Sequence, residues 1–439
     1  MGHYLPSTEG QQKEMLKDIG LSSLEQLHAV APEHLRLADG PDIPEGLSEL
    51  EVSRVMRGMA GRNKVFHSIF RGAGAYRHYI PSVVKSIVSK ETFLTAYTPY
   101  QAEISQGILQ SIFEYQTMIC DLTGMEVANA SVYDGATAVA EAVSMCRDRK
   151  RTKALVSSAA PPDYIETVKT YSWAMGAEVV MIPEKDGATD LDALTDLLDG
   201  QVASVYLQQP NYYGILENCA EAAEKAHDAG AKFIMGINPV AAAILKTPGE
   251  CGADIAVGEG QPLGMPLSFG GPYLGFMACT AALTRKLPGR IVGETVDAEG
   301  SRAFVLTLQA REQHIRREKA SSNICSNQAL CAMTAAVYMA TMGPDGLRNA
   351  AAQCAAKAHY LAAGLEKIGY IRKHSGDFFH EFVTVVPKGA QAALALLAAN
   401  DILGGLPVED GILWCATEMN SKQEMDRMLG ILADAKKEV

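Results

Sequence analysis

Hydroxyl, amide and aromatic side chains are concentrated around Pro99, in a stretch that suits a binding loop better than a protein core. Residues 95–101 read TAYTPYQ, and residues 103–107 (EISQG) add further polar groups. Hydroxyl and amide groups bind polar ligands through hydrogen bonds, and proline favours a loop at this point of the chain. We therefore expect a loop that faces a polar ligand, with a buried structural turn as the alternative.

A second irregular stretch, residues 70–81, places Gly72, Gly74 and Pro81 among aromatic residues and contains His78. The imidazole of a histidine can act as a general base near neutral pH. For His78 alone, we expect a hydrogen-bonded structural role, and general-base catalysis is the alternative.

Charge and cysteine usage argue against several classes of protein. The formal net charge of −12 disfavours nucleic acid or an anionic membrane as the main partner, because binding to phosphates relies on clustered Lys and Arg. The nine cysteines form no CxxC pair and lie mostly in apolar segments. We therefore expect reduced thiols, a cytoplasmic protein and no metal site. Neither a secretory signal nor a bilayer-spanning apolar run is visible, which predicts a soluble protein.

From about residue 108, short β-rich runs alternate with helical stretches. This alternation predicts a mostly parallel sheet with helices on both of its faces. Binding sites in such α/β sheets lie beyond the carboxyl ends of the strands, where we expect the polar loops. The predicted strands are residues 153–157, 178–182, 202–207, 232–237, 254–257 and 274–279.

The elements divide the chain into three predicted parts. Residues 1–68 form a helical N-terminal arm, in which residues 47–59 have a clear helical period. Residues 69–328 form a large α/β domain. Residues 329–439 form a small α+β domain, whose first helix begins near Ala329 and leads to Gly343 and Pro344.

This order of parts resembles the fold type I enzymes that use pyridoxal phosphate (PLP). In many of those enzymes, a buried strand is followed by a loop whose lysine forms an imine with the cofactor. Here the strand at residues 254–258 leads into the loop EGQPLGMPLSFGGP, which offers Gln261 and Pro262 instead. Neither residue has a primary amine, so this chain is not expected to hold PLP covalently at that point.

At the other positions that contact PLP in the resembled enzymes, this chain has residues that cannot make the same contacts. The position of the aspartate that keeps the pyridine nitrogen protonated falls at Ile237, and the position of the stacking ring falls near Ala159. Only a phosphate-type turn, Gly135, Ala136 and Thr137, survives in outline, preceded by Asp134, whose alternative role is a helix cap. We therefore expect a catalytically silent copy of the fold.

Several longer motifs resemble one family within this class. They are residues 72–81 (GAGAYRHYIP), 95–101, 103–107, 129–137 (NASVYDGAT) and 317–328 (REKASSNICSNQ). Together they resemble the P-protein of the glycine cleavage system, specifically its N-terminal half, which in many bacteria is a separate subunit 1. The resemblance covers nearly the whole chain.

The resemblance implies a subunit of glycine dehydrogenase (decarboxylating) that is inactive alone. The homologous subunit 2 would carry PLP on its lysine, and the pair would decarboxylate glycine and transfer the aminomethyl group to the lipoyl arm of the H-protein. We expect no catalytic residue on this chain itself and a site built at the interface of the two subunits. The residues expected to contact substrate or cofactor there are Tyr97, Thr98, Tyr100, Gln101, Ser105, Gln106 and His78, with the turn at residues 321–323 as a further candidate.

Two other functions stay open at this point. The first is a purely structural or regulatory subunit whose surface never reaches the reaction. The second is a self-sufficient PLP enzyme that uses another lysine, Lys246 or Lys319. Substitution of the polar loop residues separates the first alternative from a shared site.

Overall fold

The computed structural model describes residues 7–37, 41–95, 97–320, 322–324, 328–386, 389–409 and 411–437. The chain forms two compact units, Met1–Val65 and Phe66–Val439. Each unit is described by itself.

The first unit is helical in the parts that the structure describes. Its α-helices both begin with a capping box, formed by Thr8 with Gln11 and by Ser48 with Glu51, which satisfies N–H groups that lack partners within the helix. The helix predicted at residues 47–59 is confirmed, and none of its side chains is buried. The helical elements are α1 (Glu9–Asp18), η1 (Leu24–His28), η2 (Glu33–Leu35) and α2 (Glu49–Ala60).

A seven-stranded sheet forms the centre of the second unit. All of its pairs are parallel except those of β10, which runs antiparallel to both neighbours. The predicted, mostly parallel sheet is therefore confirmed. In spatial order, the strands are β2 (Val127–Ala128), β10 (Gly275–Cys279), β9 (Ile255–Glu259), β8 (Lys232–Ile237), β7 (Val202–Gln209), β3 (Lys153–Ser157) and β4 (Val179–Ile182).

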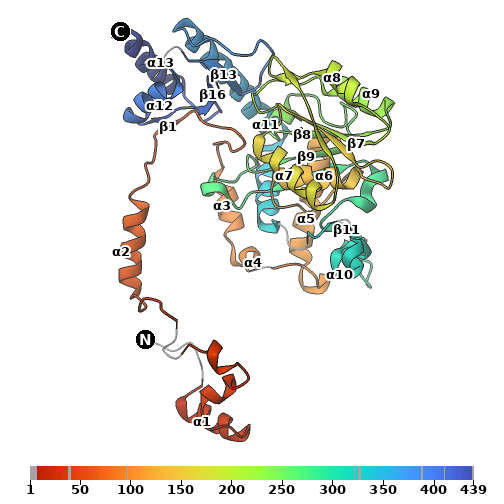
Figure 1. Ribbon diagram of the computed structural model, residues 1–439, viewed down its shortest axis with the longest axis vertical. Helices are drawn as coiled ribbons and strands as arrows, with labels where there is room; N and C mark the ends of the chain where they lie inside the picture. Colours follow the sequence, from red (N-terminus) through yellow and green to blue (C-terminus); the bar gives the residue numbers. More distant parts are fainter. Residues whose placement is uncertain are drawn as a thin grey trace. The chain divides into compact units, whose positions relative to one another are not determined.

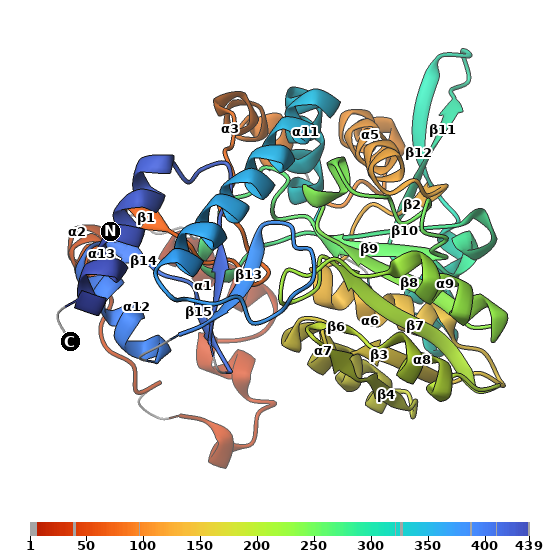
Figure 2. The ribbon, with the colours of Figure 1, turned by 90° about the horizontal axis from the view of Figure 1, so that it is seen from above.

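Helices cover both faces of this sheet, because alternate residues of its strands are apolar on each side. One face packs against α5 (Gln106–Thr123), α8 (Leu191–Leu197), α9 (Cys219–Asp228) and the first part of α11 (Ala329–Lys367). The other face packs against α6 (Gly135–Cys146) and α7 (Pro162–Ala174). In Figure 2, α5 and α11 lie on one side of the sheet and α6 and α7 on the other.

Smaller elements surround this core. The hairpin of β11 (Ile291–Val296) and β12 (Arg302–Thr307), which we did not predict from the sequence, projects from the second unit in Figure 2. Its base packs against α5. The remaining elements before α11 are α3 (Ser82–Val88), α4 (Glu91–Leu94), η3 (Ala102–Ile104), β5 (Glu184–Lys185), β6 (Ala188–Thr189), η4 (Ala241–Ala243), η5 (Ser268–Gly270), η6 (Ala281–Lys286), η7 (Gln309–Arg311), α10 (Gln313–Arg316) and η8 (Arg317–Lys319).

The C-terminal elements pack around their own apolar core, which contains Trp414 and the second part of α11. The helix predicted from Ala329 is interrupted at Gly343, where φ is 60° and Pro344 follows, but α11 continues beyond this kink to Lys367. Figure 1 shows α12, α13 and β13 grouped together. The elements are β13 (Glu381–Val385), α12 (Ala390–Ala399), β14 (Ile402–Leu403), β15 (Leu406–Val408), β16 (Gly411–Cys415) and α13 (Lys422–Lys437).

Residues at the end of the predicted arm belong to this C-terminal group. Strand β1 (Ser68–Ile69) pairs in parallel with β14, and Phe70 lies in the core around Trp414. The segment that follows β1 therefore starts beside the C-terminal strands and then runs to the edge of the large sheet.

Among the described helices, none is long and apolar enough to cross a membrane.

Candidate functional site

Gln261 lies in the loop after β9, at the position where the resemblance led us to look for a lysine. Its side chain is 1% exposed. Its Oε1 accepts a hydrogen bond from the N–H of Tyr76 (2.8 Å), and its Nε2 donates to the carbonyls of Tyr76 (2.9 Å) and Met265 (2.8 Å). The amide is thus fully engaged in fastening the segment around Tyr76 to this loop. It offers no nucleophile to a ligand.

The first turn of α6, which contains the predicted phosphate-type turn, is satisfied by carboxylates of the chain. Asp134 caps the helix, because its Oδ1 accepts from the N–H of Thr137 (2.7 Å). The N–H of Gly135 donates to Glu259 Oε2 (3.0 Å), and Glu259 Oε1 also accepts from the N–H groups of Gln261 (2.9 Å) and Leu274 (3.0 Å). A carboxylate therefore lies where a helix N-terminus would attract an anion.

Burial raises the pKa of Glu259 to about 7, although the hydrogen bonds from the three backbone N–H groups favour its charged form. The glycine at position 135 is required here. A Cβ at that position would lie 2.0 Å from Tyr164 Oη and 3.0 Å from the Cβ of Glu259. Glu259 and Tyr164 thus crowd the helix N-terminus from two sides.

The carboxyl ends of the parallel strands enclose a cavity of ≈ 30 Å³. That space admits water but is far smaller than the ~150 Å³ of a cavity that binds benzene. Its lining includes Tyr76, Tyr164, Ile237, Pro262, His380 and Glu381. A pyridine ring with a phosphate group does not fit, and neither Ile237 nor Pro262 provides a charged partner for it. Two of the predicted degenerate positions, Ile237 and Pro262, therefore line this cavity, with Gln261 next to Pro262 in the chain, and the residues there do not fit PLP.

Ala159, the fourth degenerate position, lies beside this cavity without lining it. Its carbonyl accepts a hydrogen bond from the N–H of Tyr212 (2.9 Å), and Tyr212 is a lining residue. On the opposite wall, the Glu381 carboxylate accepts from Tyr76 Oη (2.6 Å) and from the N–H of Ala73 (2.6 Å), and burial raises its pKa to about 7. The glycine-rich segment before His78 thus closes the cavity together with β13.

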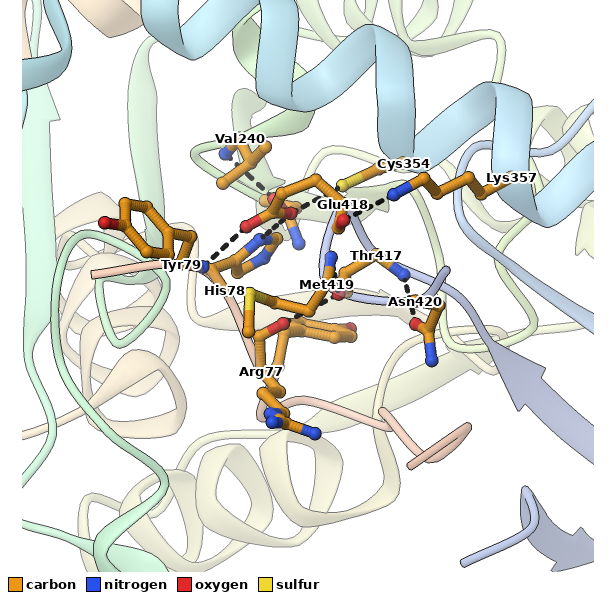
Figure 3. A network of polar contacts seen from close by, with 12 residues as sticks. Arg77, His78, Tyr79, Val240, Cys354, Lys357, Thr417, Glu418, Met419 and Asn420 are labelled. Atoms are coloured by element: carbon orange, nitrogen blue, oxygen red, sulfur yellow. Dashed lines mark hydrogen bonds and ion pairs between the residues drawn. The ribbon is translucent and has the colours of Figure 1, made fainter. Parts of the chain in front are cut away.

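His78 is buried, and its Nδ1 lies 2.8 Å from Glu418 Oε2. Glu418 Oε1 accepts from the N–H of Tyr79 (2.6 Å), the thiol of Cys354 donates to Oε2 (3.2 Å), and Lys357 donates to the Glu418 carbonyl. Figure 3 shows these groups converging on Glu418 from α11 and from the segment that contains His78. Burial opposes the charge on Glu418, but the hydrogen bond from His78 and the other donors outweigh it and lower its pKa to about 2.

The geometry shows one contact of His78. Its ring bonds to Glu418 of the same chain, and a contact of His78 with substrate or cofactor at the subunit interface stays a prediction. The structural role that we expected for His78 alone agrees with its burial and hydrogen bond.

Residues 97–105 form an irregular loop that leads through η3 to the N-terminus of α5. Tyr97 is 78% exposed, Gln101 is also exposed, and Thr98 is half-buried. Tyr100 is anchored, because its hydroxyl accepts from Arg290 Nη2 (2.7 Å) and its ring lies 5.0 Å from the guanidinium carbon. The loop is therefore held at its centre while neighbouring side chains face outward.

The last two loop candidates lie at the start of α5, where the Ser105 side chain makes no capping hydrogen bond and the Gln106 side chain is bonded within the chain. Ser105 is the N-cap residue of α5 and is half-buried. The Gln106 amide bonds to the backbone of Phe304 in both directions, at 2.8 and 2.9 Å, which ties α5 to strand β12. Gln106 is thus bonded within the chain, and its contact with substrate or cofactor at the interface stays a prediction.

The remaining candidates lie away from the cavity. Ser322 Oγ donates to Glu141 Oε1 (3.0 Å), whereas Ser321 lies outside the described residues. Lys246 and Lys319 are both exposed, and neither lines the cavity. An exposed ammonium group is not desolvated, so the rival assignment of an imine-forming lysine gains no support from this geometry.

Sequence reasoning missed the residues that fill the cavity, above all Glu259, Tyr164 and His380. The sequence did contain a signal for Glu259, because this carboxylate is the last residue of the otherwise apolar strand Ile255–Glu259. Buried carboxylates need several donors, and the N-terminus of a helix is a frequent source of them. The partners themselves could not be read from the local sequence.

Comparisons with known proteins agree over nearly the whole chain. The family described as glycine cleavage system P-protein matches residues 2–432. A probable glycine dehydrogenase (decarboxylating) subunit 1 from Moorella thermoacetica is 48% identical over 443 residues, which cover 98% of this chain and 100% of that protein. A protein of the same description from Desulforamulus reducens is 49% identical over 434 residues, with 96% and 97% covered.

Solved structures agree with these relatives. A crystal structure of glycine decarboxylase (P-protein) of the glycine cleavage system, in inhibitor-bound form, has a TM-score of 0.92 and 44% sequence identity, covering 99% of this chain and 100% of that one. A sphingosine-1-phosphate lyase from Burkholderia pseudomallei has a TM-score of 0.68 at 13% identity, covering 92% and 93%. The second similarity concerns the fold alone, and the predicted fold type I architecture is confirmed.

Proposed function

This chain belongs to the glycine cleavage system P-protein family, and we propose that it is the half of a two-subunit glycine decarboxylase that holds no cofactor. Its full-length similarity to proteins described as subunit 1 of glycine dehydrogenase (decarboxylating) is the observation that carries this proposal. The description as a subunit supports a partner, subunit 2.

In the proposed complex, subunit 2 binds PLP on a lysine. The complex decarboxylates glycine and transfers the aminomethyl group to the lipoyl arm of the H-protein. Two features of this chain support the division of roles. Position 261 holds a fully hydrogen-bonded amide, and the cavity beside it has a volume of ≈ 30 Å³.

The contribution of this chain is binding and positioning at the subunit interface. Tyr97, Thr98 and Gln101 offer hydroxyl and amide groups from a loop that Arg290 anchors through Tyr100. In the partner's pocket, such groups would orient a small polar substrate by hydrogen bonds, and the aromatic rings around them would exclude water. Ser105 supports the loop as the first residue before α5.

We place the complex in the cytoplasm. Every cysteine within the described part of the chain is free, which supports a reducing compartment.

The test compares this chain alone, subunit 2 alone and both together. The measured quantity is the glycine-dependent exchange of labelled bicarbonate in the presence of PLP and lipoylated H-protein, and the cofactor absorbance of each sample is recorded. We expect exchange only when both subunits are present, and we expect no bound cofactor in the sample that contains this chain without subunit 2. Exchange by this chain without its partner, or cofactor absorbance on it, would contradict the proposal.

A further inference from the structure

Glu259 occupies a position that is built to receive an anion. Three backbone N–H groups converge on its carboxylate, from Gly135 in the first turn of α6, Gln261 in the loop after β9 and Leu274 just before β10. The Gln261 donor is local, since it lies two positions after Glu259, but Gly135 is 124 positions away, so the fold brings the N-terminus of α6 to this carboxylate. Backbone donors of this kind, at the N-terminus of a twelve-residue helix, form the usual cradle for a phosphate group.

We propose that Glu259 is an internal substitute for a phosphate group: its carboxylate fills the anion site at the N-terminus of α6 and closes this chain to phosphate-bearing ligands. The backbone N–H donors of an anion site are thus present, but a carboxylate of the same chain occupies them. The inference concerns this chain alone and does not depend on the decarboxylase activity of the complex.

The packing around the carboxylate supports this assignment. Tyr164 and Glu259 both lie close to Gly135, because a Cβ there would be 2.0 Å from the Tyr164 hydroxyl and 3.0 Å from the Cβ of Glu259. A glycine that allows such a close approach to a helix N-terminus is a feature of phosphate-binding turns. Here the approaching groups are side chains of the same chain.

Unsatisfied polar groups next to Glu259 provide a second, independent observation. His380 is 1% exposed, and neither of its ring nitrogens has a hydrogen-bond partner among the described residues. The Nδ2 of Asn238 is also buried without a partner in that part of the chain. Both residues line the same ≈ 30 Å³ cavity as Glu259. Buried polar groups normally have hydrogen-bond partners, so these groups without partners indicate that this side of the cavity is suited to bind a polar ligand.

The protonation of Glu259 agrees with its proposed role of excluding phosphate. Because burial raises the pKa of Glu259 to about 7, the carboxyl group loses part of its charge near neutral pH while its volume stays the same. Exclusion of phosphate by wild-type protein is therefore expected at pH 6 as well as at pH 8, because it rests on occupied space and occupied donors.

The experiment measures the binding of labelled inorganic phosphate to the full-length chain by equilibrium dialysis. Glu259→Ala removes the carboxylate and frees the three N–H donors. We expect this variant to bind phosphate at least tenfold more tightly than the wild-type chain. Glu259→Gln keeps the volume of the side chain and should bind no more tightly than wild type.

A matched control is Glu141→Ala. Glu141 is a buried carboxylate near the middle of α6 and is bonded to Ser322 rather than to the N-terminus of the helix. Its removal tests whether the loss of any buried negative charge on this helix creates phosphate binding, and we expect none.

Circular dichroism would establish that each variant is folded, and Glu259→Ser, which retains one hydroxyl group, takes the place of Glu259→Ala if the alanine variant does not fold. The proposal is overturned if the folded variant binds phosphate no more tightly than wild type. It is equally overturned if wild type or Glu141→Ala already binds phosphate as tightly as Glu259→Ala.

Discussion

The cavity at the strand ends and the loop at residues 97–105 contain similar types of side chain but use them in opposite ways. Glu259 in the lining of the cavity and Gln261 beside it direct their polar atoms into the backbone of the same chain. In the loop, Arg290 anchors Tyr100, while Tyr97 and Gln101 are exposed.

This difference separates two roles for polar residues in this chain. Groups that are fully bonded within the chain contribute to its stability, and their substitution should lower the free energy of unfolding. Groups that face outward contribute little to stability and are available to a partner. Substitutions in the two regions should therefore affect different measurements.

The largest effect on stability is expected from Gln261→Lys in the closed cavity. The variant restores an amine at the position of the missing lysine, but it places an ammonium group at a buried site and removes the acceptor for the N–H of Tyr76. We expect the free energy of unfolding to fall by about 4 kcal/mol, as measured by urea denaturation. We also expect no gain of PLP absorbance, because the cavity has no room for the ring.

Gln101→Lys provides the matched control in the open loop. Because Gln101 is exposed, the stability should change by no more than about 0.5 kcal/mol. A comparable loss of stability in both variants would remove the distinction between the two regions.

A smaller effect is expected from His78→Ala, which removes the donor to Glu418. In the folded protein the pKa of Glu418 is lowered to about 2, from about 4.5 in the unfolded chain. The carboxylate therefore stabilises the fold at pH values above 4.5, and this stabilisation is lost as the pH falls towards 2. The variant should lower the free energy of unfolding by roughly 3 kcal/mol at pH 7. Its stability should also depend less on pH between 5 and 3 than that of wild type.

His314→Ala is the control for this change. His314 is exposed and lies 3.6 Å from Glu312, so its substitution should leave both the stability and its pH dependence close to wild type. An unchanged pH dependence in His78→Ala would show that His78 does not account for the low pKa of Glu418.

In the open loop, the double variant Thr98→Ala, Gln101→Ala should affect activity rather than folding. We expect glycine–bicarbonate exchange by the mixed subunits to fall at least about tenfold, which corresponds to about 1.4 kcal/mol of transition-state stabilisation. Gln110→Ala, an exposed amide on α5, is the control and should leave exchange unchanged. Full exchange by the double variant would favour a purely structural or regulatory subunit.

The smallest effect is expected from Tyr100→Phe, at the anchor of the loop. The variant removes the hydroxyl that accepts from Arg290 but keeps the ring near the guanidinium group. The free energy of unfolding should fall by about 1 kcal/mol. Tyr79→Phe, at another exposed tyrosine, is the control. A similar fall in the free energy of unfolding in that variant would mean that the hydrogen bond from Arg290 to Tyr100 does not account for the effect.

Much of the architecture could be predicted before the structure was described. The alternation of strands and helices predicted the mostly parallel sheet, and the helix predicted to run from Ala329 to Gly343 and Pro344 is the first part of α11. These predictions succeed because hydrophobic period and chain-breaking residues act locally. The antiparallel direction of β10 and the hairpin of β11 and β12 were missed, because strand direction depends on pairing between distant segments.

For the candidate site, the sequence by itself determined which chemistry is absent. Gln261 and Pro262 have no amine, and Ile237 has no carboxylate, whatever their surroundings. The tertiary structure alone decided what fills the resulting space. His78 and Glu418 are 340 positions apart, and Gly135 and Glu259 are 124 positions apart. Residue type limits which bonds a side chain can form, but only the packing of distant segments selects its partner.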